Sequence, residues 1–266
     1  MIRLDNISMT FHQGTVNENE ALKNIDLTVN EGDFITIIGS NGAGKTTLYN
    51  IIAGTVTPTS GRILIRGKDV TTMPEYKRAR NIGRIFQDPT LGTASNMSIE
   101  DNMMISYKKG FKGLSISLNS RMRAFFHEQL KALDMGLEDR MKDNVGLLSG
   151  GQRQALTLLM MVLSKPDLIL LDEHIAALDP RNAELVMKLT MRFIEEFGLT
   201  TMMITHNMAL AIEYGNRLLM MDEGEIILDI QGEEKKRMTV EKLVHKFKNI
   251  RKKTLANDEI LLSEQT

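Results

Sequence analysis

The residues that most clearly could bind a ligand form a glycine-rich segment, Gly39-Ser40-Asn41-Gly42-Ala43-Gly44-Lys45-Thr46, with Thr47 directly after it. Glycines let backbone N–H groups converge on phosphate oxygens, and a following helix N-terminus adds its dipole. In such a segment Lys45 bridges the β and γ phosphates, and the Thr46 hydroxyl ligates magnesium. The segment therefore predicts a site for the phosphates of a nucleotide.

A pair of carboxylates, Asp172-Glu173, ends the apolar run Leu168 to Leu171. A carboxylate at the C-terminal end of a strand beside a phosphate loop can hold the metal, which is the role expected for Asp172. Glu173 is placed to polarise a water for attack on the γ-phosphate. The alternative is a buried strand that ends in a solvated acidic pair.

The segment Leu148-Ser149-Gly150-Gly151-Gln152 opens a helical pattern 20 residues before Asp172. Two glycines and a serine at a helix start make a second anion site, and one ATP cannot occupy both sites. With this segment the chain resembles the ABC ATPase family over nearly its whole length. In that family the partner subunit supplies the signature, so the resemblance implies a head-to-tail dimer around two nucleotides.

Four further positions match the order of the family's motifs. Gln87 resembles the Q-loop glutamine, Asp179 the D-loop aspartate and His206 the switch histidine. The resemblance implies that Gln87 contacts magnesium and water, that Asp179 crosses the dimer interface and that His206 holds the γ-phosphate. Phe11 stands where an aromatic ring stacks on adenine, although it could instead be a core residue of a strand.

The resemblance implies an ATP hydrolase with ATP and Mg²⁺ as cofactors. We expect catalytic roles for Glu173, His206 and Gln87, and metal contacts for Thr46, Gln87 and Asp172. The implied partners are a second, identical ATPase subunit, an integral membrane permease and, indirectly, a substrate-binding protein, with no nucleic acid. The expected location is the cytoplasmic face of the cell membrane, reached through the permease.

The two residues after Glu173 depart from the family's common pattern: His174 replaces a proline, and Ile175 replaces a threonine or serine. Residues Asp143 to Gly146 lack a pattern seen in many exporters, which favours import. The segments 86–89, 92–94 and 172–174 are similar to ATPases that work with aromatic amino-acid binding proteins. The alternatives are the ATPase of an exporter or a non-transport member, such as an iron-sulphur cluster assembly ATPase.

Several apolar segments predict the elements that position these residues. Phe34 to Ile38, Leu168 to Leu171 and Met202 to Ile204 are near-continuous apolar runs, typical of central parallel strands. Ile25 to Val29 alternates and, with Arg62 to Arg66, indicates a small antiparallel sheet. The predicted fold is α/β, a P-loop NTPase of the ABC ATPase type with an antiparallel β subdomain and an inserted helical subdomain.

The predicted ATP-binding domain covers residues 1–235, with its helical subdomain at about 89–165. Ser98 and Asp101 form a capping-box pattern within the insert. We expect the permease to dock on residues 88–96 and on the helix after Ser98, through Ile99, Asn102, Met103 and Tyr107. Internal packing is the alternative for Met103 and Tyr107.

Residues 236–266 are predicted to form a basic amphipathic helix and a tail. The segment Lys235 to Lys253 carries nine basic residues against Glu241, although the net charge of the chain is -1. Apolar residues recur in it at helical spacing, which favours a packed helix over a nucleic-acid or lipid contact.

Composition excludes several classes of protein. The chain has 19 methionines, but their adjacent pairs diverge on any regular element, which favours core packing over a soft-metal site. With no cysteine, a disulfide framework is excluded. The longest apolar stretch, Ala155 to Leu163, is about half of a membrane-spanning helix, so we expect neither a membrane span nor export.

Overall fold

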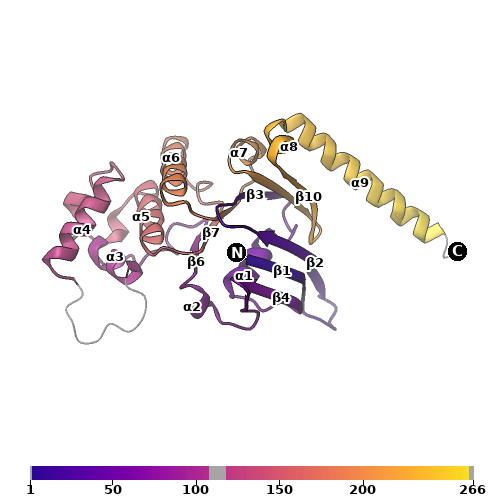
Figure 1. Cartoon of the computed structure of the whole chain (residues 1–266), viewed down its shortest axis with the longest axis horizontal. Helices are drawn as coiled ribbons and strands as arrows, with labels where there is room; N and C mark the ends of the chain where they lie inside the picture. The colour runs from indigo at the N-terminus through magenta and orange to yellow at the C-terminus, as the bar shows by residue number, and fades with distance from the viewer. Residues whose placement is uncertain (1, 108–117, 264–266) are drawn as a thin grey trace.

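The computed structural model describes residues 2–107 and 118–263, with side chains through residue 251. Helices α3, α4 and α5 lie at one end of the molecule, and helix α9 extends from the other end (Figure 1). Two β-sheets lie between them, and the phosphate loop belongs to the larger one.

The smaller sheet has the strand order β2-β1-β4-β5 and is antiparallel. Its strands are β1 (Ile2–Phe11), β2 (Asn19–Val29), β4 (Ser60–Ile65) and β5 (Lys68–Asp69). In β2 the residues Ile25, Leu27 and Val29 are buried while their neighbours Asp26 and Thr28 are exposed. The prediction of a half-buried antiparallel sheet is confirmed.

The larger sheet has the order β10-β9-β3-β8-β7-β6. It is parallel from β9 (Arg217–Asp222) through β3 (Phe34–Gly39), β8 (Thr201–Ile204), β7 (Leu168–Asp172) and β6 (Ile82–Ile85). Strand β10 (Glu225–Gln231) pairs antiparallel with β9. The three predicted central strands are neighbours, so the loops after them open at one edge of the sheet.

Apolar packing on both faces explains the continuous apolar runs of these strands. Helix α1 (Lys45–Ala53) lies in one core that is shared by the two sheets. Helices α5 (Gly150–Leu163) and α6 (Pro180–Phe197) cover the opposite face in a second core. Short helices α2 (Glu75–Arg78) and α7 (Met208–Glu213) complete the sheet region.

The inserted helical region contains α3 (Ile99–Tyr107), α4 (Ser120–Lys131) and α5, with short 3-10 turns at Glu138–Arg140 and Val145–Leu147. The predicted cap forms, since the Ser98 hydroxyl donates to the Asp101 carboxylate at 2.6 Å and accepts from the Asp101 backbone N–H at 3.1 Å. Helix α3 therefore starts where the sequence indicates.

The expectation that α3 presents its residues to a permease is wrong for three of them. Ile99 and Met103 are fully buried and Asn102 is 5% exposed. The Asn102 amide donates to the carbonyls of Ala94 and Ser98, so it is a clamp for the preceding loop. Tyr107 packs on the rings of α4 and is still 37% exposed. Helix α3 packs on α4 and α5, which leaves these three side chains inside.

Two helices follow β10, α8 (Gly232–Lys236) and α9 (Val240–Ser263). Helix α9 packs through Leu243 and Phe247 on a third apolar core with α7 and β9. Val240 is 37% exposed, so the apolar stripe of α9 is only partly covered. The four adjacent methionine pairs are all buried, which confirms that they fill the core: Met103, Met104, Met160, Met161, Met202, Met203, Met220 and Met221.

Candidate functional site

The phosphate loop leaves β3 and runs directly into α1. Gly44 has φ +94° just before α1 begins, a conformation that favours glycine. The Lys45 ammonium donates to the Gly39 and Ser40 carbonyls, at 2.8 Å each, and so braces the loop from inside. Burial lowers the pKa of Lys45, an effect that nearby Glu173 and Asp172 oppose. The loop is thus preformed around a lysine.

Glu173 and His206 meet across two adjacent parallel strands. The Glu173 N–H donates to the Ile204 carbonyl, which aligns the residue after β7 with the end of β8. The His206 Nε2 lies 2.5 Å from the Glu173 Oε1. Glu173 has φ +49°, a strained conformation that is rare for residues with a side chain and is often found at functional sites.

One cavity of about 380 Å³ gathers most of the predicted nucleotide site. Two residues that the sequence analysis missed, Asn19 and Ala21 of β2, also line it. Phe11 lines this cavity and also packs against the core, so its contact with adenine stays a prediction. The predicted residues that line the cavity are Phe11, Asn41, Gly42, Ala43, Gly44, Lys45, Thr46, Thr47, Glu173 and His206.

The other predicted residues lie outside this lining. Gln87 is exposed in the loop after β6, and the Ser40 hydroxyl donates to Asp222 at 2.9 Å. The full set outside the lining is Gly39, Ser40, Gln87, Ser149, Gly150, Gly151, Gln152, Asp172 and Asp179. A single chain therefore does not bring the signature to its own phosphate loop.

The signature segment forms a capped helix start. The Ser149 hydroxyl accepts from the Gln152 N–H, and the Gln152 side chain accepts from the Ser149 N–H, at 3.2 Å each. A Cβ at Gly151 would lie 2.6 Å from the side chain of Asn182, so any other residue there would require that side chain of α6 to shift. Asp179 caps α6 by accepting from the Asn182 N–H. The two motifs are thus packed against each other.

Asp172 has an unforeseen partner in Arg84 of β6. The Arg84 guanidinium donates to the Asp172 Oδ2 at 3.1 Å and to the Asn50 amide oxygen at 2.7 Å, and it stacks on Phe86. Both charged side chains are nearly buried. The available signal was a single arginine within the otherwise apolar run Ile82 to Phe86.

His174, the departure from the family's proline, is fully buried. Its Nε2 lies 3.2 Å from the Thr190 hydroxyl, which donates to the Val186 carbonyl and so can accept from the ring. Burial lowers the pKa of His174 from 6.5 to about 4. The Gln154 amide donates to the His174 carbonyl at 2.7 Å. The loop after Glu173 is therefore tied to both α5 and α6.

A phosphate loop at the carboxyl edge of a parallel sheet, facing a strained glutamate and its histidine, defines a P-loop nucleotide hydrolase. Residues 22–176 match the ABC transporter family, and the chain belongs to it. It is 39% identical to the tyrosine transport ATP-binding protein of Clostridioides difficile strain R20291, over 93% of this chain and 98% of that one. It is 36% identical to a methionine import ATP-binding protein of Enterococcus faecalis, over 85% and 64%.

Solved structures agree with this membership. The dimeric structure of a bacterial ABC transporter cassette superposes with a TM-score of 0.73 at 29% identity, covering 87% of this chain and 98% of that one. A dimeric post-hydrolysis cassette bound to ADP and phosphate gives a TM-score of 0.71 with the same coverage. The predictions of the fold and of an ATP-hydrolysing subunit that energises import are confirmed. Such subunits bind ATP, dimerise and work with a membrane permease.

Proposed function

We propose that this chain hydrolyses ATP with Glu173 as the general base, in the cavity that Lys45 and His206 share. The observation that carries the proposal is the 2.5 Å contact between His206 and Glu173, opposite the phosphate loop. It supports a glutamate held in one orientation, ready to take a proton from the attacking water. As ATP enters, Lys45 can leave the Gly39 and Ser40 carbonyls for the β and γ phosphates.

The oxygens at this site suit magnesium. Thr46 offers an exposed hydroxyl, and Arg84 holds one oxygen of the Asp172 carboxylate, which supports presentation of the other one. Magnesium prefers such oxygen ligands and, when bound with ATP, would offset charge on the β and γ phosphates. Thr46, Asp172 and the side chain of Gln87 are the proposed contacts. Gln87 is exposed, so it has room to turn towards the cavity.

The test of the base is Glu173→Gln, which keeps the shape and the contact with His206. We expect unchanged ATP binding, hydrolysis lower by two orders of magnitude or more, and an ATP-dependent dimer in light scattering. Glu184→Gln is the matched control, because Glu184 pairs with Lys188 on the exposed face of α6. Normal turnover by Glu173→Gln would remove Glu173 from this role.

The signature residues are proposed to act on the partner's nucleotide. Ser149, Gly150, Gly151 and Gln152 lie at the start of α5, outside the cavity of their own chain, which supports a site completed by a second copy. The start of α5 adds N–H groups and a positive dipole end for a γ-phosphate. Asp179, packed beside them at the start of α6, is proposed to cross the same interface.

A mixture of two defective chains tests this arrangement. A dimer of Lys45→Ala and Gly151→Asp chains has one site with both lesions and one site with neither. We expect the mixture to recover hydrolysis that neither variant shows alone. Substantial activity of Gly151→Asp by itself would contradict the proposal.

The proposed cargo is an aromatic amino acid, delivered by a substrate-binding protein to the permease. The similarity to a tyrosine transport ATP-binding protein over nearly the full length of both chains supports it. Deleting this chain from its host is expected to abolish uptake of labelled tyrosine but not of methionine. Wild-type chain should restore uptake, whereas Glu173→Gln should not; tyrosine uptake that survives the deletion would refute this assignment.

The permease is proposed to dock at a cavity of about 270 Å³ between β6 and α5, next to the loop after Gln87. Glu75, Phe86, Gly92 and Thr157 are among its lining residues. Leu91 in this loop is 65% exposed, which supports a contact surface there. Leu91→Glu is expected to abolish permease pull-down and leave the ATPase rate of the isolated chain unchanged. Retained pull-down would place the contact elsewhere.

The proposed division is an ATP-binding domain at 1–235, with its helical subdomain at about 89–165, and a C-terminal extension at 236–266. The described helices α3 to α5 fall within the proposed subdomain. Within the described residues, no helix is both long and apolar enough to cross a bilayer. Attachment to the inner membrane face through the permease is a separate proposal, supported by the similarity to a transporter ATP-binding protein.

A further inference from the structure

The C-terminal helix reaches the phosphate loop through one buried carboxylate. Asp222, the last residue of β9, accepts from the Ser40 hydroxyl at 2.9 Å. From the other side, Arg251 of α9 donates its Nε to the Asp222 Oδ2 at 2.8 Å and an Nη to the Oδ1 at 3.3 Å. The Asp222 side chain is 8% exposed. A residue 29 positions along the chain thus neutralises a charge that touches the loop.

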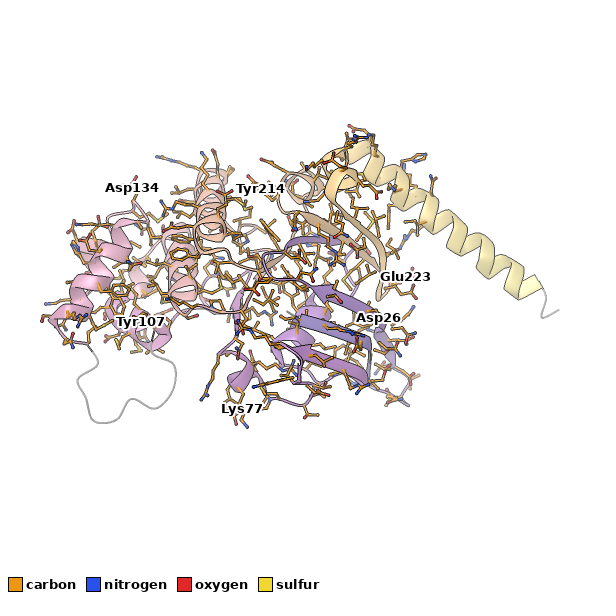
Figure 2. The ribbon with its side chains drawn as sticks, in the orientation of Figure 1. Asp26, Lys77, Tyr107, Asp134, Tyr214 and Glu223 are labelled. Carbon is orange, nitrogen blue, oxygen red and sulfur yellow. The ribbon has the colours of Figure 1, made fainter. Side chains whose placement is uncertain are left out.

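The turn after Asp222 is fitted closely to the phosphate loop. A Cβ on Gly39 would lie 2.2 Å from the Met221 carbonyl oxygen, and one on Gly44 would lie 3.5 Å from the Gly224 Cα. Glu223 and Gly224 have φ +47° and +84°, which makes the tight β9–β10 hairpin. Figure 2 shows Glu223 at the tip of this hairpin, on the side of the molecule where α9 passes. Loop and hairpin therefore hold each other in place.

Arg251 is itself oriented by α9. Its guanidinium lies over the Phe247 ring at 5.3 Å, and Phe247 packs on the core that α9 shares with α7 and β9. A second contact, 3.6 Å to Glu223, keeps the arginine on the hairpin. Because Phe247 of α9 and Glu223 of the β9–β10 turn both contact Arg251, the pair with Asp222 is more than a chance surface contact.

The sign of the charge effect follows from the ligand. ATP brings several negative charges to the loop. Without a cationic partner, the Asp222 carboxylate beside Ser40 would repel them, and because Asp222 is buried, solvent ions screen this repulsion poorly. Arg251 removes that repulsion. We propose that α9 sets the nucleotide affinity of the phosphate loop by neutralising Asp222 through Arg251, which makes Asp222 and Arg251 positioning residues. The proposal deepens the function above, because it rests on the phosphate loop as the ATP site.

The test is a double-mutant cycle at positions 222 and 251 in the full chain, measured by equilibrium binding of fluorescent ATP and ADP analogues. Arg251→Gln is expected to weaken the ATP analogue about five- to ten-fold, the lower end of usual site-to-site coupling. The ADP analogue should weaken less, since it carries less charge. Asn at 222 still accepts from Ser40, so Asp222→Asn combined with Arg251→Gln should restore the affinity to within about two-fold of the wild-type value.

Matched variants keep this test decisive. Lys246→Gln removes the same charge from α9, but Lys246 pairs with Glu234 at 2.9 Å, so its binding should match wild type. Arg251→Lys keeps the charge and should stay near wild type. Unchanged binding by Arg251→Gln, an unrestored double variant, or an equal loss in Lys246→Gln would each overturn the proposal. Binding by the wild-type chain tests the ATP site separately, so the two failures are distinguishable.

Discussion

The region around the phosphate loop and the region around the signature differ in how much of their site one chain completes. Lys45, Glu173 and His206 lie in the segments that follow the neighbouring strands β3, β7 and β8, and they line one cavity. Ser149 and Gly151 lie on the inserted helical region and outside that cavity. The difference teaches that the described chain assembles the cavity at its phosphate loop but keeps its signature apart from that cavity, which is why hydrolysis is proposed to need a second copy.

The largest expected effect separates binding from hydrolysis. Lys45→Ala should lower both ATP affinity and hydrolysis, because it removes the cation that meets the phosphates. Gly151→Asp should lower hydrolysis on the order of 10²-fold or more while the isolated chain still binds ATP. Calorimetric titration measures the ATP affinity, and a phosphate-release assay measures hydrolysis. An equal loss of affinity in the two variants would mean that the two regions do not differ in nucleotide binding.

A second difference concerns the polar clamp inside each region. Arg78 is buried and donates to five carbonyls, two of them at the end of α1, those of Ile51 and Ile52. Arg78→Met should lower the free energy of unfolding by about 3 kcal/mol or more, because several buried acceptors lose their donor.

The matching clamp in the helical region is smaller. Asn102→Leu breaks fewer contacts, with the loop at Ala94 and Ser98, and should lower the free energy of unfolding by about 2 kcal/mol. Urea denaturation of both variants ranks the two clamps. A greater loss for Asn102→Leu than for Arg78→Met would reverse the comparison.

The stability of the loop after Glu173, which His174 ties to α6, should respond to pH. The folded pKa of His174 is about 4, below its ordinary 6.5, so the unfolded chain binds the proton first as the pH falls. The contribution of neutral His174 to the free energy of unfolding is therefore fully present above pH 6.5. It falls by about 3 kcal/mol as the pH drops to 4. His174→Gln keeps an N–H for Thr190 and should flatten that part of the profile. An unchanged slope between the two pH values would contradict this reading.

The smallest effect is expected beside the signature. Leu147 is 71% exposed in the described chain, so Leu147→Ala should change the free energy of unfolding by less than about 0.5 kcal/mol. Thermal unfolding measures this change. A larger loss of unfolding free energy would mean that the turn at Leu147 is packed against the protein and not exposed.

The sequence by itself determined the features that depend on neighbours along the chain. The phosphate loop, the acidic pair after β7, the cap at Ser98 and the central strands all follow from residue type and from periods of 2 or 3.6. The order of the motifs then indicated the family, because each motif has its own local chemistry. The methionine pairs were placed in the core by the same reasoning.

Tertiary structure alone decided which of these segments meet. The sequence misplaced Ile99, Asn102 and Met103, because a short helix does not reveal which face its neighbours cover. The lone Arg84 in an apolar run signalled a buried charge but did not identify Asp172 as its partner, and nothing indicated that Ser40 reaches Asp222 across 182 residues. Such contacts depend on the strand order and on how two sheets and α9 pack, and no local period encodes that arrangement.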